Sequence, residues 1–249
     1  MSDPQRLYGL KALITHAAGG IGEASARTLV KHGARVLAVD TVNSGVEQHF
    51  KSVKGIDGHS TVLNDAARMP ALVEEAVKRL GGIDILINDF PPQPDAALSD
   101  GDEEANVLIE LRSALVMSIS RAALPHLKKS PAGRIINIGF LRSVFSAEGA
   151  GSFATSEQDL AASTKALAAE TGSFGITVNY VQPGAIMTPA SRDVFKKDMA
   201  LRDFCIANSA ARRLGEPVDI AKVVLFLASD DAAFVSGTGV LVDGGTTSL

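Results

Sequence analysis

Short apolar runs alternate with longer amphipathic stretches along most of the chain, and this alternation is its main structural signal. A short apolar run bounded by turn residues is typical of a buried strand. Such runs predict strands at residues 11–15, 35–39, 60–63, 83–88, 134–138, 176–181 and 239–242. Amphipathic stretches predict helices at residues 20–32, 68–80, 103–128, 152–171 and 218–228. This alternation predicts a parallel sheet covered by helices on both faces.

The chain is long enough for one large α/β domain, and nothing in it marks a boundary between domains. It has 249 residues and contains no internal repeat, low-complexity segment or linker. Its most polar and turn-rich stretch, residues 91–101, is predicted to be a loop within the domain. We therefore expect a single domain over residues 1–249.

A glycine-rich turn follows the first predicted strand and opens the first predicted helix. Residues 15–22 read THAAGGIG, and Asp40 ends the second strand eighteen residues after Gly22. Glycines at such a turn let backbone amides approach a pyrophosphate, and a carboxylate at the second strand end can bind a ribose 2′-hydroxyl. This order favours NAD over NADP. The alternatives are that Gly20 and Gly22 serve helix packing alone, and that Asp40 is an ordinary strand-end turn residue.

The fourth long helix carries a pattern known from one family. Residues 153–170 read FATSEQDLAASTKALAAE and resemble the active-site helix of the short-chain dehydrogenase/reductase family. Segments 213–217, 220–229 and 237–245 also match the C-terminal part of that family, so the resemblance covers the whole chain. It implies a Rossmann-like, doubly wound parallel sheet of seven strands in a single domain.

The residues that the family uses in catalysis are replaced at every matched position. The family has Asn on the long central helix, then Ser, Tyr and Lys; here these positions hold Arg112, Phe140, Phe153 and Glu157. A phenyl ring has no proton to exchange, and a carboxylate cannot lower a phenol pKa as an ammonium does. We therefore predict no catalytic residue. Arg112 and Glu157 carry opposite charges and are predicted to pair; the alternative is that both are partly solvated and independent.

The cofactor-binding segments depart from the family in the same way. His16 stands at the first glycine of the turn, and residues 88–91, Asn-Asp-Phe-Pro, replace Asn-Asn-Ala-Gly. A side chain at the glycine, a large ring and an added carboxylate all crowd or repel a dinucleotide. The expected cofactor site is therefore vestigial, binds no cofactor tightly, and consists of Gly20, Ile21, Gly22 and Asp40. His16 has no second histidine nearby in sequence and is expected to be structural.

Composition excludes several other classes of function. The net charge is −4 with a pI near 5.7, which gives no basic surface for nucleic acid or an anionic membrane. No apolar stretch approaches the roughly 20 residues of a membrane span. A single cysteine, Cys205, permits no internal disulfide and makes a metal site unexpected. We expect a soluble cytoplasmic protein.

The loss of the family's catalytic residues, together with intact scaffold segments, suggests a function in assembly. The chain resembles the inactive-subunit type of heterotetrameric short-chain dehydrogenases. This resemblance implies a non-catalytic subunit that assembles with an active paralogue, which would bind NAD and act on an alcohol such as a hydroxyacyl-CoA. Two alternatives remain. One is a repurposed fold with non-redox chemistry, either dehalogenase-like or lyase-like, the lyase using Glu157, Asp89 or His16. The other is a module that senses a metabolite in the cleft.

Overall fold

The computed structural model describes residues 5–90, 103–139 and 151–245, with the backbone alone described for 103–110 and 151–156. Seven parallel strands form one sheet in the order β3-β2-β1-β4-β5-β6-β7. The strands are β1 (Lys11–Ile14), β2 (Arg35–Asp40), β3 (Ile56–Ser60), β4 (Ile85–Asp89), β5 (Arg134–Ile138), β6 (Thr177–Pro183) and β7 (Gly239–Val242). The expected seven-stranded, doubly wound parallel sheet is confirmed.

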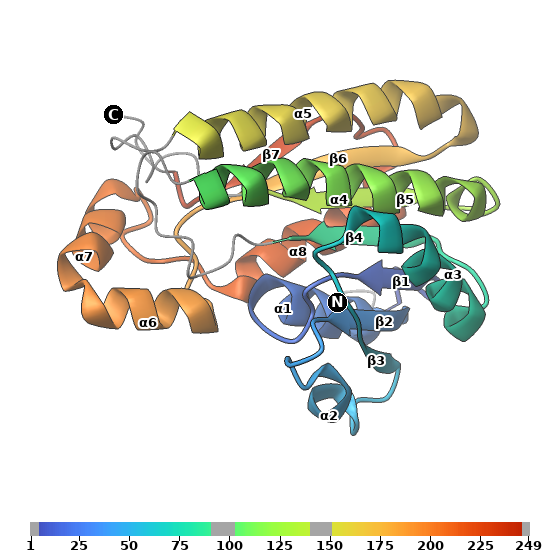
Figure 1. Cartoon of the computed structure of the whole chain (residues 1–249), viewed down its shortest axis with the longest axis horizontal. Coiled ribbons are helices and arrows are strands. Elements are labelled where there is room, and N and C mark those ends of the chain that lie inside the picture. The colour runs from blue at the N-terminus through green and yellow to red at the C-terminus, as the bar shows by residue number, and fades with distance from the viewer. Residues whose placement is uncertain (1–4, 91–102, 140–150, 246–249) are drawn as a thin grey trace.

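Helices cover both faces of this sheet (Figure 1). Helices α1 (Gly20–Lys31) and α8 (Pro217–Ala228) pack together on one face. Helices α3 (Met69–Leu80), α4 (Glu103–Leu127) and α5 (Gly151–Thr171) pack side by side on the other. Each face encloses its own apolar core because neighbouring residues of a buried strand point to opposite sides, as Leu13 and Ile14 of β1 do.

Three further helices were not predicted from the sequence. They are α2 (Val46–Phe50), α6 (Pro189–Lys197) and α7 (Met199–Asn208), of which α6 and α7 lie together at one end of the molecule (Figure 1). Helix α2 is too short to show a helical period. Helix α6 is mostly polar, and its start is fixed by a capping box in which Thr188 and Ser191 bond each other's backbone N–H.

The third strand lies four residues earlier than predicted. The apolar run at residues 60–63 indicated a strand there, but β3 is Ile56–Ser60, with the sequence IDGHS. This strand forms the edge of the sheet and pairs only with β2, so polar side chains are tolerated and the apolar signal is weak. Leu63 instead leaves the sheet and packs into the core on the α3 face.

The strand order reverses between β1 and β4, since the chain builds outward from β1 to β2 and β3 and then continues on the other side with β4. In open α/β sheets, the crevice beyond the carboxyl ends of the strands at such a switch point is where ligands bind. The carboxyl ends of β1, β2, β4 and β5 therefore define the candidate site.

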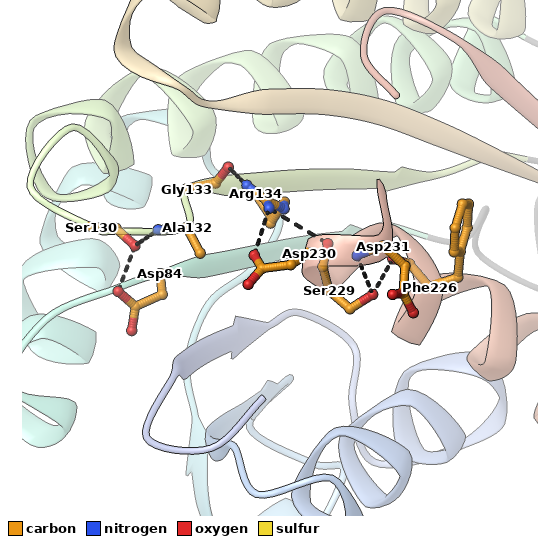
Figure 2. Close-up of polar contacts among 9 residues, drawn as sticks. All are labelled: Asp84, Ser130, Ala132, Gly133, Arg134, Phe226, Ser229, Asp230 and Asp231. Atoms are coloured by element: carbon orange, nitrogen blue, oxygen red, sulfur yellow. Dashed lines mark hydrogen bonds and ion pairs between the residues drawn. The ribbon is translucent and has the colours of Figure 1, made fainter. Parts of the chain in front are cut away.

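The opposite end of the sheet is fixed by polar contacts around Arg134, the first residue of β5 (Figure 2). Its guanidinium donates to the Gly133 carbonyl at 3.0 Å and pairs with Asp230 at 3.3 Å. Asp84 accepts a hydrogen bond from Ser130 at 2.6 Å beside it. These contacts tie the loop before β5 to β4 and to the end of α8.

Candidate functional site

The glycine-rich turn connects β1 to α1 and keeps the geometry that the sequence indicates. Gly20 has a φ of 57°, a conformation that favours glycine. A Cβ on Gly22 would lie 2.4 Å from the His16 carbonyl oxygen, so a glycine is needed there for the turn to pack on its own helix. The packing role of Gly22 is thus shown, and it is compatible with a ligand at the same helix N-terminus.

Asp40 lies directly beside this turn. Its carboxylate accepts hydrogen bonds from the Ala18 N–H at 2.7 Å and the Thr41 N–H at 2.7 Å. Each carboxylate oxygen has a second lone pair, so Asp40 can still accept hydrogen bonds from ribose hydroxyls. The structure therefore holds Asp40 next to the glycine-rich turn, as the sequence analysis expected.

His16 bridges the turn and the end of β4. Its φ of 47° is left-handed, and its imidazole Nδ1 lies 2.7 Å from the Asp89 carbonyl oxygen. The ring also meets Phe90 edge-on, with the ring centroids 5.3 Å apart. Burial lowers the pKa of His16, although the nearby Asp40 charge and the Asp89 carbonyl oppose the shift. The imidazole is therefore neutral near pH 7.

Asp89 is a buried carboxyl group at the carboxyl end of β4. Its backbone N–H donates to Thr15 Oγ1 at 3.0 Å, and Thr15 Oγ1 donates to its carbonyl at 2.9 Å. Burial raises the pKa of its side chain to about 7; Asp40 adds to the rise, while Arg112 and the Gly22 backbone oppose it. A group that titrates near neutral pH can both give and take a proton.

Arg112 of α4 and Glu157 of α5 form a buried ion pair. Arg112 Nη1 lies 2.7 Å from Glu157 Oε1, and both side chains are less than a tenth exposed. Arg112 Nη2 also donates to the Ile138 carbonyl at the end of β5, at 2.7 Å. Burial lowers the pKa of Arg112, and Glu157 opposes that shift. The predicted pairing is confirmed, and the alternative of two independent, solvated side chains is wrong.

The glycine before position 140 makes room for this pair. A Cβ on Gly139 would lie 2.5 Å from Glu157 Oε2 and 3.2 Å from the Val181 carbonyl oxygen. The Glu157 carboxylate therefore occupies the space directly above the end of β5. Phe140 and the side chain of Phe153, at the positions that the family gives to Ser and Tyr, lie outside the described residues.

A buried polar network behind the site was missed by sequence reasoning. Asn88 Nδ2 donates to Ser120 Oγ at 3.0 Å and to Asn137 Oδ1 at 2.8 Å, and Asn137 Nδ2 donates to Thr164 Oγ1 at 3.0 Å. The network links β4, β5, α4 and α5. Its sequence signal was available, because an asparagine inside an apolar strand needs a buried partner.

The described residues fit a dinucleotide at one end of the site. The backbone at Gly20 and Ile21 lies at a helix N-terminus suited to a diphosphate, and Asp40 supplies an acceptor for a ribose, while the Gly22 backbone already hydrogen-bonds the buried Asp89 carboxyl. Within residues 5–90, 103–139 and 151–245, no three His, Cys, Asp or Glu side chains gather as a metal site would require. No helix in the same ranges is long and apolar enough to cross a membrane.

Comparison with known proteins identifies the class. A family model described as Enoyl-(Acyl carrier protein) reductase matches residues 17–247. Together with the sheet order and the turn at Gly20, this match shows that the chain belongs to the short-chain dehydrogenase/reductase family. Membership of that family, expected from the sequence, is confirmed.

Several similar proteins share one name. The 3-oxoacyl-[acyl-carrier-protein] reductase FabG of Escherichia coli is 36% identical over 240 residues, which span 95% of this chain and 97% of the relative. That of Haemophilus influenzae is 36% identical over 242 residues, spanning 96% and 98%. That of Thermotoga maritima is 32% identical over 247 residues, again spanning 96% and 98%.

These relatives correct the predicted function. The sequence suggested a catalytically inactive subunit of a hetero-oligomeric dehydrogenase, or a repurposed or sensing module. Full-length similarity to proteins named as reductases contradicts that expectation and points to an oxidoreductase. The prediction rested on the four replaced catalytic positions, Arg112, Phe140, Phe153 and Glu157, and gave them more weight than the similarity of the rest of the chain to active reductases.

Proposed function

We propose that this chain is an NAD-dependent oxidoreductase that reduces the carbonyl group of a 3-oxoacyl thioester. The observation that carries the proposal is the similarity to 3-oxoacyl-[acyl-carrier-protein] reductases over 95% of the chain. The fold supports it, because the carboxyl ends of β1, β2 and β4 meet at the switch point where such sheets bind dinucleotides.

The cofactor in this proposal is NAD, held by Gly20, Ile21, Gly22 and Asp40. Asp40 favours a free ribose hydroxyl over a 2′-phosphate, because a carboxylate accepts a hydrogen bond from the one and repels the other. When bound, the nicotinamide supplies the hydride. The sequence-based expectation that this chain binds the cofactor only weakly is a prediction that the dissociation constant for NAD will decide.

The chain must supply the proton that the reduced carbonyl oxygen takes up. Phe140 and Phe153, at the positions that the family gives to Ser and Tyr, carry no exchangeable proton. Among the described carboxyl groups, Asp89 has a pKa raised to about 7 and lies at the carboxyl end of β4. We assign proton exchange to Asp89. Arg112 keeps it titratable near neutral pH, because its positive charge offsets part of the rise that burial causes.

A spectrophotometric assay tests both parts of the proposal. The purified chain is given NADH or NADPH with acetoacetyl-CoA, and cofactor oxidation is followed. We expect turnover with NADH as the preferred cofactor. The Asp89→Asn variant should lose about 100-fold or more in kcat, as the loss of a general acid does. The exposed carboxylate of Asp231 provides a matched control, so Asp231→Asn should keep the wild-type rate.

Two results would count against it. Bound NADH without oxidation across a series of 3-oxoacyl thioesters would overturn the reductase proposal. Full activity in Asp89→Asn would be compatible with the reductase proposal but would show that Asp89 is not the residue that exchanges the proton.

Assembly with an active short-chain dehydrogenase paralogue, as a tetramer in the cytoplasm, stays a separate prediction. Large apolar side chains are exposed on and after α8, including Phe226, Phe234 and Leu241. Exposed apolar side chains of this size support a protein–protein contact. Native mass spectrometry of the protein purified from its own cells tests it, because a complex with a second short-chain dehydrogenase would differ in mass from a homo-oligomer.

A further inference from the structure

His16 adopts a backbone conformation that is unfavourable for its residue type. Its φ is 47°, and among the described non-glycine residues only Arg212, with a φ of 54°, shares this left-handed region. A side chain there costs free energy that glycine avoids, so such residues merit a functional explanation when they lie at a ligand site. His16 lies at that kind of position, in the turn before α1.

The contacts of the imidazole decide which nitrogen carries the proton. Nδ1 lies 2.7 Å from the Asp89 carbonyl oxygen, which can only accept a hydrogen bond, so Nδ1 is the donor. In the neutral ring, Nε2 then carries a lone pair and is an acceptor. Edge-on contact with Phe90 holds the ring in this orientation.

Nε2 is free to receive a ligand. The described residues provide no hydrogen-bond partner for it, and it is not among their buried, unpartnered polar atoms. His16 as a whole is partly exposed. Asp40 lies near enough for its charge to act on the ring. Two hydrogen-bond acceptors therefore belong to this turn and its neighbour: the neutral imidazole nitrogen of His16, and the Asp40 carboxylate, which accepts from the Ala18 N–H two residues further along at 2.7 Å.

We infer that His16 is a specificity-determining residue, whose Nε2 accepts a hydrogen bond from a hydroxyl group of the adenosine ribose while Asp40 accepts from the other. This inference rests on the proposed NAD site. A ribose with free 2′- and 3′-hydroxyls offers two donors for two acceptors. A 2′-phosphate removes one donor and adds negative charge beside Asp40. His16 and Asp40 together therefore favour NAD over NADP in two ways, through a hydrogen bond that NADP cannot make and through charge repulsion.

Binding measurements separate this role from a structural one. Calorimetry gives the dissociation constants of NAD and NADP for wild type, His16→Gly and His16→Asn. Glycine and asparagine both tolerate the left-handed backbone, but neither places an acceptor where the imidazole nitrogen lies. We expect both variants to bind NAD up to about tenfold more weakly, the size of one hydrogen bond. Their affinity for NADP should not fall.

Arg212→Gly is the matched control, because it relieves the same backbone conformation on an exposed residue after α7. It should leave both dissociation constants unchanged. Equal weakening of NAD and NADP in the His16 variants, or no change in either, would show a structural role and overturn the inference while the proposed function stands. Weaker binding of NAD, with unchanged binding of NADP, in Arg212→Gly would also overturn the inference about His16. Wild-type protein that binds neither nucleotide would overturn the proposed cofactor site itself.

Discussion

Two arginine–glutamate pairs join the same two helices and differ chiefly in burial. Arg112 of α4 meets Glu157 of α5 at 2.7 Å, with side chains 6% and 7% exposed. Arg121 and Glu170, further along the same helices, meet at 3.2 Å with side chains 56% and 50% exposed. The residue types and the helices are the same, so the comparison isolates what the surroundings do to an ion pair.

The surroundings decide what each pair contributes. An exposed pair loses most of its attraction to solvent screening and is worth about 0–1 kcal/mol. A buried pair has given up the hydration of both charges, so each partner depends on the other. The inner pair therefore fixes the arrangement of α4, α5 and the end of β5 through Ile138, whereas the outer pair contributes little to it.

The largest predicted effect comes from removing one partner of the inner pair. Arg112→Met leaves the Glu157 carboxylate buried without its cation and should lower the free energy of unfolding by about 3–5 kcal/mol. Urea denaturation measures it. The double variant Arg112→Met, Glu157→Leu should be more stable than Arg112→Met alone, because no charge is left buried. A single variant as stable as wild type would show that the pair is not needed.

A second prediction concerns Asp89, whose pKa the positive charge of Arg112 also influences. Its pKa is about 7 in the folded protein and about 3.9 in the unfolded chain, so the folded state holds a proton that the unfolded state releases between these values. The stability that this proton contributes is complete below about pH 3.9 and is lost as pH rises through 7. Between about pH 3.9 and pH 7, the free energy of unfolding of wild type should therefore fall relative to that of Asp89→Asn. The fall should be a few kcal/mol, which corresponds to the pKa difference between the folded and unfolded states. Parallel curves of unfolding free energy against pH for the two proteins would contradict it.

The sequence predicted the scaffold and one contact within the site well. Strands such as residues 134–138 match β5 because a fully buried parallel strand is apolar throughout. The charges of Arg112 and Glu157 predicted their pairing because two opposite charges at neighbouring buried positions would each cost free energy if they were left unpaired.

What the sequence could not give depends on three-dimensional surroundings. The raised pKa of Asp89 arises from burial and from Asp40 on another strand, which no local pattern encodes. The His16 tautomer depends on a carbonyl 73 residues away. The edge strand β3 and helix α6 have weak patterns, since their polar residues are tolerated at the periphery and their stability comes from pairing and capping.

Arg134 gives an intermediate case at the other end of the sheet. Its side chain is 4% exposed, but its carboxylate partner Asp230 is 91% exposed. Asp230→Asn should therefore cost at most about 1 kcal/mol, because Arg134 keeps its hydrogen bond to the Gly133 carbonyl. Thermal unfolding checks this. A loss as large as that of Arg112→Met would mean that an exposed partner can matter as much as a buried one.

The smallest predicted effect is at the outer pair itself. Glu170→Gln should change the free energy of unfolding by less than about 0.5 kcal/mol, and the change should vanish at high salt because both side chains are solvated. Glu157→Gln, its matched substitution at the inner site, should be strongly destabilising at every salt concentration, since screening ions do not reach a buried pair. Urea denaturation of both variants at low and high salt measures this difference. If the two substitutions share the same salt dependence, burial is not what separates the two pairs, and the explanation must lie in the contact between Arg112 and Ile138.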